Sequence, residues 1–295
     1  MSHWTLDDVP WHKFDPSKVD PETLRIVKAA GLVEYNGHEY VRYLHNVFSD
    51  DPNFQEEAAA WGVEEVQHGS ALGKWAAMAD PDFDFEGAFK RFIDGYKLET
   101  NVAASVRGSR AGELIARCIV ETGTSSYYTA LAEATDEPVL KDICRKIAAD
   151  ELRHYKLFYK RLKPYLEQEN LGSWGRLRVA IGRIAESEDD ELAYAYYAAN
   201  ATPDQPYDRK RWNRAYVSRA YAIYREHHIE RGMAMVFKAV GLTPNGWLNR
   251  VAHIRSTFVP VAPASVSERL SAVGFSNISI AHKGGAYRLR AFRPF

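Results

Sequence analysis

The sequence predicts an all-α protein: a four-helix bundle with additional C-terminal helices and a small α+β appendage. Helical patterns fill most of the first 240 residues, and turns rich in aspartate and proline separate them. Two Glu-x-x-His steps, Glu65–His68 and Glu151–His154, each follow a lone glutamate by about 30 residues. Residues three apart share a helix face, so each step directs a carboxylate and an imidazole toward one point.

The first elements follow from their boundary signals. Residues 1–20 contain scattered prolines and aromatic residues and are predicted to be irregular. Asp20 followed by Pro21 is typical of a helix start, and a helix is predicted over about 21–48. An Asp-Asp-Pro turn ends it, and the next helix covers about 53–79. A short helix is expected over 84–97.

The remaining elements are predicted in the same way. Helices are expected over about 110–134, 138–168, 174–200, 208–240 and 246–256. A proline-containing linker then begins near Phe258, and a helix over 265–273 and strands over 275–280 and 286–292 follow it. The predicted organisation is an irregular segment over 1–20, a helical domain over 21–256, and a linker with the α+β appendage over 257–295.

The two long hairpins align with each other. Val33-Glu34 matches Val120-Glu121, and each pair precedes a tyrosine by six residues and a leucine by ten. Each lone glutamate lies about fourteen residues before an aspartate-rich turn, and each Glu-x-x-His lies about fourteen residues after it. Two copies of such a hairpin make a four-helix bundle with a pseudo-twofold site at its centre.

This pattern predicts a dinuclear metal site. The predicted ligands are four glutamates and two histidines: Glu34, Glu65, His68, Glu121, Glu151 and His154. Glu39 is close to Glu34 in the sequence, but the spacing favours Glu34. Carboxylates and imidazoles suit iron or manganese, so two Fe ions are expected, with Mn as the alternative.

Other residues give weaker signals. The only cysteines, Cys118 and Cys144, lie in helical patterns and are expected to be small buried residues, which excludes a cysteine-rich metal site. The run Glu226–Glu230 contains His227 and His228, but adjacent histidines face different sides of a helix. This run is therefore expected to be solvated surface rather than a metal site.

Composition limits the class of protein. A net charge of −1 argues against nucleic-acid binding. The first residues lack the apolar stretch of a signal peptide, and no apolar run approaches the roughly 18 residues that span a membrane. A cytoplasmic protein without disulfides is expected.

Two segments resemble the signatures of a known family. Trp61-Gly-Val-Glu-Glu65-Val-Gln-His68-Gly and Ile143-Cys-Arg-Lys-Ile-Ala-Ala-Asp-Glu151-Leu-Arg-His154 are similar to the two motifs of the soluble acyl-carrier-protein desaturases. That family belongs to the ferritin-like di-iron superfamily. The resemblance covers about residues 20–165 and implies a ferritin-like bundle with the six ligands named above.

The resemblance also implies roles for two further residues. Thr124 matches a threonine beside the oxygen-binding side of the cluster; otherwise it is a helix-face hydroxyl bonded to its own backbone. Asp150 matches a carboxylate that orients a ligand histidine by accepting its outer N–H. Ser70 departs from the family, which often has an aspartate there, and Tyr155 stands where the family has an acid.

The implied activity is O2-dependent desaturation of an acyl chain on an acyl carrier protein, with electrons from a ferredoxin-type donor. A homodimer is implied as well. Arg209-Lys210-Arg211 is either a contact for the acidic carrier or an ordinary solvated helix face. Two other functions fit the same ligands: a di-iron oxygenase that hydroxylates or N-oxygenates a small metabolite, and a ferritin-like or rubrerythrin-like iron- or peroxide-handling protein.

Overall fold

The computed structural model describes residues 3–186, 190–202, 204–242, 276–283 and 286–292. The chain forms two compact units, Met1–Asn245 and Gly246–Phe295. As the sequence predicts, the described part of the first unit is built from α-helices. Within the described residues, no helix combines the length and the apolar character needed to cross a membrane.

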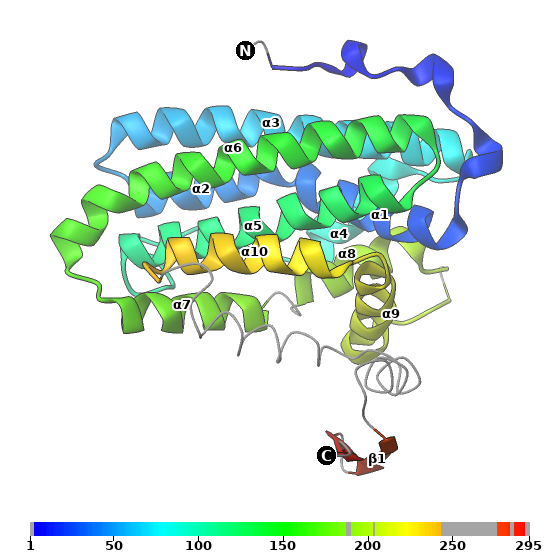
Figure 1. Ribbon diagram of the computed structural model, residues 1–295. Coiled ribbons are helices and arrows are strands. Elements are labelled where there is room, and N and C mark those ends of the chain that lie inside the picture. Colours follow the sequence, from blue (N-terminus) through cyan, green and yellow to red (C-terminus); the bar gives the residue numbers. More distant parts are fainter. Residues whose placement is uncertain (1–2, 187–189, 203, 243–275, 284–285, 293–295) are drawn as a thin grey trace. The chain divides into compact units, whose positions relative to one another are not determined.

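Six helices make up the first half of this unit. They are α1 (Pro21–Tyr35), α2 (Gly37–Val47), α3 (Pro52–Ala79), α4 (Phe85–Gly95), α5 (Arg110–Ala134) and α6 (Pro138–Glu169). Side chains cap most of their N-termini, and the predicted cap at Asp20 accepts a hydrogen bond from the backbone N–H of Thr23 at 2.7 Å. α1 and α2 pack on α3, α5 packs along α6, and α3 also contacts α6 (Figure 1). The candidate metal ligands lie on four of these helices.

The helix predicted over 21–48 is broken at Asn36, two residues after Glu34. The junction lies in close contact with α3, where glycines let the two backbones approach. A Cβ atom on Gly69 would lie 2.4 Å from the backbone nitrogen of Tyr35, and one on Gly37 would lie 2.8 Å from the Cβ of Glu65. The sequence shows these glycines but not what they face.

Four more helices follow: α7 (Ser173–Glu186), α8 (Asp190–Asn200), α9 (Arg209–Ala222) and α10 (Glu226–Ala239). α7 and α10 pack on α5, α8 packs on α1 and α4, and α9 packs on α8. The single helix predicted over 208–240 is therefore wrong. The chain turns between Ala222 and Glu226 because α9 and α10 pack against different helices.

The N-terminal segment, residues 3–18, runs along α3 and α6 and contains three short 3₁₀ turns: Leu6–Asp8, Trp11–Lys13 and Pro16–Lys18. Trp4, Trp11 and Phe14 pack against the hydrophobic core. The backbone N–H of Asp15 donates to Glu137, the buried carboxylate that caps α6. The segment that the prolines predict to be irregular is thus held against the helices by apolar packing and hydrogen bonds.

In the second unit, β1 (Ser276–Lys283) and β2 (Ala286–Phe292) pair in antiparallel fashion. The helices predicted over 246–256 and 265–273, with the linker between them, lie outside the described residues.

Candidate metal centre

Four helices bring the six predicted ligands together. α1 supplies Glu34, α3 supplies Glu65 and His68, α5 supplies Glu121, and α6 supplies Glu151 and His154. Each Glu-x-x-His step spans nearly one turn, so both of its side chains leave the helix on the same side. The relative exposure of Glu34, Glu121, Glu151 and both histidines is at most 6%.

The ligand atoms form two overlapping groups. One group is Glu34, Glu65, His68 and Glu151; the other is Glu65, Glu121, Glu151 and His154. In each group the donor atoms lie within 4.8 Å of one another. Glu65 and Glu151 belong to both groups. If each group held an ion, Glu65 and Glu151 would be shared by the two ions, whereas Glu34 and Glu121 would each contact one.

Both histidines turn Nδ1 inward. Nδ1 of His68 lies 3.3 Å from Oε1 of Glu151, and Nδ1 of His154 lies 3.1 Å from Oε1 of Glu65. Outward, Nε2 of His68 lies 3.0 Å from Asp150 and Nε2 of His154 lies 2.7 Å from Glu64. A carboxylate at Nε2 holds the proton there and leaves the Nδ1 lone pair for a metal ion.

Unpartnered atoms show that the residues fit a metal. Five buried atoms of this cluster have no hydrogen-bond partner among the described residues: Glu34 Oε2, Glu65 Oε1, His68 Nδ1, Glu151 Oε1 and His154 Nδ1. Buried polar atoms are normally satisfied, so this concentration of exceptions at one point fits a site for cations. A cation at each group would satisfy them together.

The charges of the cluster are strongly coupled. Burial and repulsion from Glu151 raise the pKa of Glu121 to about 8, and burial together with Glu151 and Glu34 raises the pKa of Glu65. Burial would also raise the pKa of Glu151, but hydrogen bonding to His68 and the charge of His154 outweigh it and lower that pKa to about 2. Without a cation, the cluster therefore holds protons that metal ions would displace.

The pKa values of the two histidines are shifted as well. Burial lowers the pKa of His68, but its contacts with Asp150, Glu151 and Glu34 outweigh burial and raise that pKa above the ordinary value. His154 behaves alike, since Glu121, Glu64 and Glu65 surround it.

Three further side chains touch the ligands. The hydroxyl of Thr124 donates to Oε2 of Glu151 and also lies 3.2 Å from the carbonyl of Val120, so it contacts both a candidate ligand and its own helix backbone. The phenol of Tyr128 donates to Oε1 of Glu34 at 2.6 Å. The Trp61 ring meets His154 edge-on at a centroid distance of 6.4 Å.

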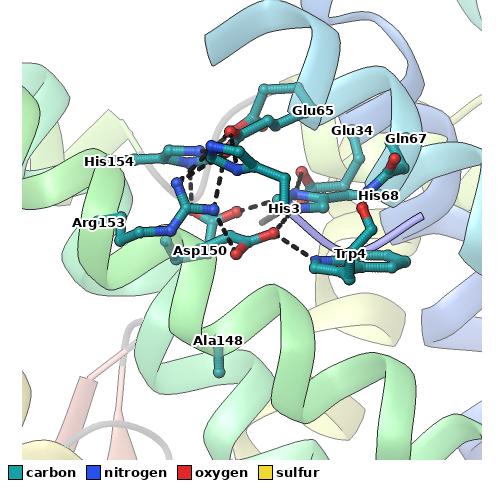
Figure 2. A network of polar contacts seen from close by, with 12 residues as sticks. His3, Trp4, Glu34, Glu65, Gln67, His68, Ala148, Asp150, Arg153 and His154 are labelled. Carbon is teal, nitrogen blue, oxygen red and sulfur yellow. Dashed lines mark hydrogen bonds and ion pairs between the residues drawn. The ribbon is translucent and has the colours of Figure 1, made fainter. Parts of the chain in front are cut away.

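Sequence reasoning missed the outer partners of the histidines, apart from Asp150. Glu64 contacts His154, and His3 contacts Glu64. Trp4 contacts Asp150 (Figure 2). Glu64 could have been found, because it adjoins Glu65 in the same motif. Nothing near residues 3 and 4 in the sequence points to a partner 146 residues away.

The prediction for His227 and His228 is wrong about the direction of their rings. The two rings were expected on different sides of a helix, yet their centroids are 3.9 Å apart and both face Glu133. They lie in the first turn of α10, where Nδ1 of His228 accepts a hydrogen bond from the backbone N–H of Arg225. A neutral His228 then carries its proton on Nε2, facing Glu133, and offers no lone pair there to a metal.

A comparison with models of known protein families gives no match for this chain. A comparison with curated protein sequences gives none either.

Proposed function

We propose that this chain is a di-iron oxidoreductase that uses O2 and desaturates an acyl chain bound to an acyl carrier protein. The observation that carries the proposal is the pair of overlapping Glu/His groups with five unpartnered buried atoms. The bundle that holds them is proposed to be ferritin-like, because four helices of a duplicated hairpin supply the ligands.

The ligand types favour iron. Four carboxylates and two imidazoles suit Fe(II) or Mn(II), and neither Cys118 nor Cys144 belongs to the groups. Four carboxylates would neutralise two divalent ions, so the loaded site carries little net charge to bury. Two ferrous ions, when bound, supply electrons that activate O2.

The surrounding residues have defined tasks in this proposal. Glu65 and Glu151 would each contact both ions, and Tyr128 fixes Glu34 through a hydrogen bond between buried groups. Thr124 donates to Glu151 and lies part-buried on the side of α5 that carries Glu121. Aromatic residues such as Trp61 exclude water from the site, which protects a strong oxidant from side reactions.

The substrate and partners follow from the family resemblance of the Glu65 and Glu151 segments. Desaturation removes two hydrogens from adjacent carbons; with O2, two electrons and two protons it gives an olefin and two waters. A ferredoxin-type protein would deliver the electrons. The exposed Lys210 and Arg211 on α9 offer positive charge to an acidic carrier. We also propose that the protein is a homodimer in the cytoplasm.

The test begins with protein loaded anaerobically with Fe(II), whose metal content is measured. It is then mixed with acyl carrier proteins of several chain lengths, a ferredoxin system and O2, and the products are analysed by mass spectrometry. About two irons per chain and a product two hydrogens lighter are expected. Glu65→Ala should abolish both, while Glu39→Ala, on the neighbouring helix and paired with Arg42, should preserve both.

The other outcomes identify the alternatives. A product that gains one oxygen atom would replace desaturation by oxygenation. Consumption of peroxide or O2 without an organic product would favour an iron- or peroxide-handling protein. A chain that binds no iron would refute the proposal.

A further inference from the structure

The N-terminal segment reaches the outer side of the candidate metal centre at two points. The indole N–H of Trp4 donates to Oδ2 of Asp150 at 2.6 Å, and this same oxygen lies 3.0 Å from Nε2 of His68. Nδ1 of His3 lies 2.7 Å from Oε1 of Glu64, whose other oxygen contacts His154. Each ligand histidine thus has an outer carboxylate. Trp4 contacts that of His68, as Figure 2 shows, and His3 contacts that of His154.

Arg153 joins these two arms. Its guanidinium donates to Oδ1 of Asp150 at 2.5 Å and to Oε2 of Glu64 at 3.1 Å. The order of contacts is therefore His68, Asp150, Arg153, Glu64 and His154, a continuous polar network outside the two groups of ligands. Asp150 uses both oxygens in it and receives donors from three side chains.

Trp4 is itself held in place. Its ring lies parallel to that of His68, with an interplanar angle of 4° and a centroid distance of 6.0 Å. Its carbonyl accepts a hydrogen bond from Gln67 on α3 at 2.9 Å. An indole fixed by its ring, its backbone and its N–H can determine where Asp150 sits, and Asp150 in turn determines the orientation of the His68 ring.

We propose that Trp4 and His3 are positioning residues of the metal centre, which fix the two ligand histidines through Asp150 and Glu64. The inference rests on the proposed dinuclear site. The outer hydrogen-bond partner of a ligand histidine orients the ring and raises its basicity, and losing such a partner typically lowers metal affinity about 10–100-fold. Trp4 and His3 act one step further out, on the carboxylates themselves.

The decisive variant is Trp4→Phe, which keeps an apolar ring but removes the N–H donor. Trp11→Phe is its matched control, because the Trp11 indole lies in the same segment and donates to the carbonyl of Leu6 at 2.7 Å, away from the ligands. Co²⁺ serves as the probe: its binding constants are measured in competition with a chelator, and its visible spectrum reports ligand geometry. Trp4→Phe should lower the binding constant of one of the two Co²⁺ ions by roughly tenfold and alter the visible spectrum. Trp11→Phe should change neither the binding constants nor the spectrum.

His3→Ala tests the second arm without risk to folding, since the His3 side chain is 60% exposed. It should weaken Co²⁺ binding less than Trp4→Phe, because solvent competes for Glu64 at this exposed contact. If wild type binds two Co²⁺ and neither Trp4→Phe nor His3→Ala changes affinity or spectrum, the segment is only a cover and the inference fails. A wild-type chain that binds no Co²⁺ refutes the dinuclear site itself, and the inference with it.

Discussion

At the scale of single residues, the six candidate ligands are not equivalent. Glu65 and Glu151 belong to both groups, whereas Glu34 and Glu121 belong to one each. Glu151 also contacts both histidines, at 3.3 Å from Nδ1 of His68 and 3.9 Å from Nδ1 of His154. Removing the charge of a shared carboxylate should therefore reduce metal binding more than removing the charge of a carboxylate that belongs to one group.

Glu151→Gln is expected to abolish binding of both ions, because each loses a ligand. Glu121→Gln should leave the ion that Glu34, Glu65, His68 and Glu151 can still hold. Metal per chain after Mn(II) loading and desalting measures the difference: near zero for the first variant and about one for the second. Equal losses would contradict the assignment of Glu151 as the bridge.

At the scale of helices, glycine sets how closely α3 approaches the α1–α2 junction. On Gly69, a Cβ would lie 2.4 Å from the Tyr35 nitrogen and 2.6 Å from its Cα, both backbone atoms that cannot simply rotate away. Tyr35 adjoins Glu34, so displacing this junction also displaces a ligand. Gly123 on α5 is the opposite case, since it is exposed and nothing lies within 4 Å of a Cβ there.

Gly69→Ala is expected to lower the free energy of unfolding by on the order of 3 kcal/mol, through overpacking. Gly123→Ala should raise it by about 0.5–1 kcal/mol, because alanine suits a helix interior better than glycine does. Urea unfolding of both variants measures these changes. If Gly69→Ala were as stable as wild type, the close approach of α1 and α3 would be wrong.

At the scale of the whole molecule, the metal-free site makes stability depend on pH. The pKa of Glu121 is raised from its ordinary 4.5 to about 8, so across that range the folded chain holds a proton that the unfolded chain has released. Stability therefore falls as pH rises through this window. The raised pKa values of His68 and His154 act in the same direction, because their stabilising charge is lost at high pH.

The metal-free protein is thus expected to melt at a lower temperature at about pH 8 than at about pH 6, by on the order of 5 °C. Mn(II) displaces these protons, so the rise in melting temperature that it causes should be larger at the higher pH. Thermal unfolding with and without Mn(II) at both pH values tests this. Glu121→Gln is the control, since it should reduce the pH dependence; an unchanged dependence would exclude Glu121 as its source.

The sequence could predict that the six candidate ligands converge, because local spacing determines which side chains share a helix face. A Glu-x-x-His step places its two side chains on one face of any helix, and the duplication supplied the second half of the site. For the helix over 21–48 the sequence marks Gly31 and Gly37 as weak points, but it does not give the break at Asn36 or the turn between α9 and α10. Both lie where helices pack against partners distant in the sequence. The contact of Trp4 with Asp150 likewise joins two residues that are 146 positions apart in the sequence.

The distribution of the two groups over the hairpins has a thermodynamic consequence. Glu65 comes from the first hairpin and Glu151 from the second, yet each belongs to both groups. The donor atoms already lie within 4.8 Å of one another without an ion, so the first ion to bind has only to fix the two shared carboxylates in one orientation. The second ion then finds its bridges already placed and loses less conformational entropy on binding. Occupancy should therefore be cooperative, with chains holding either no ion or two, and singly loaded chains scarce at any metal concentration.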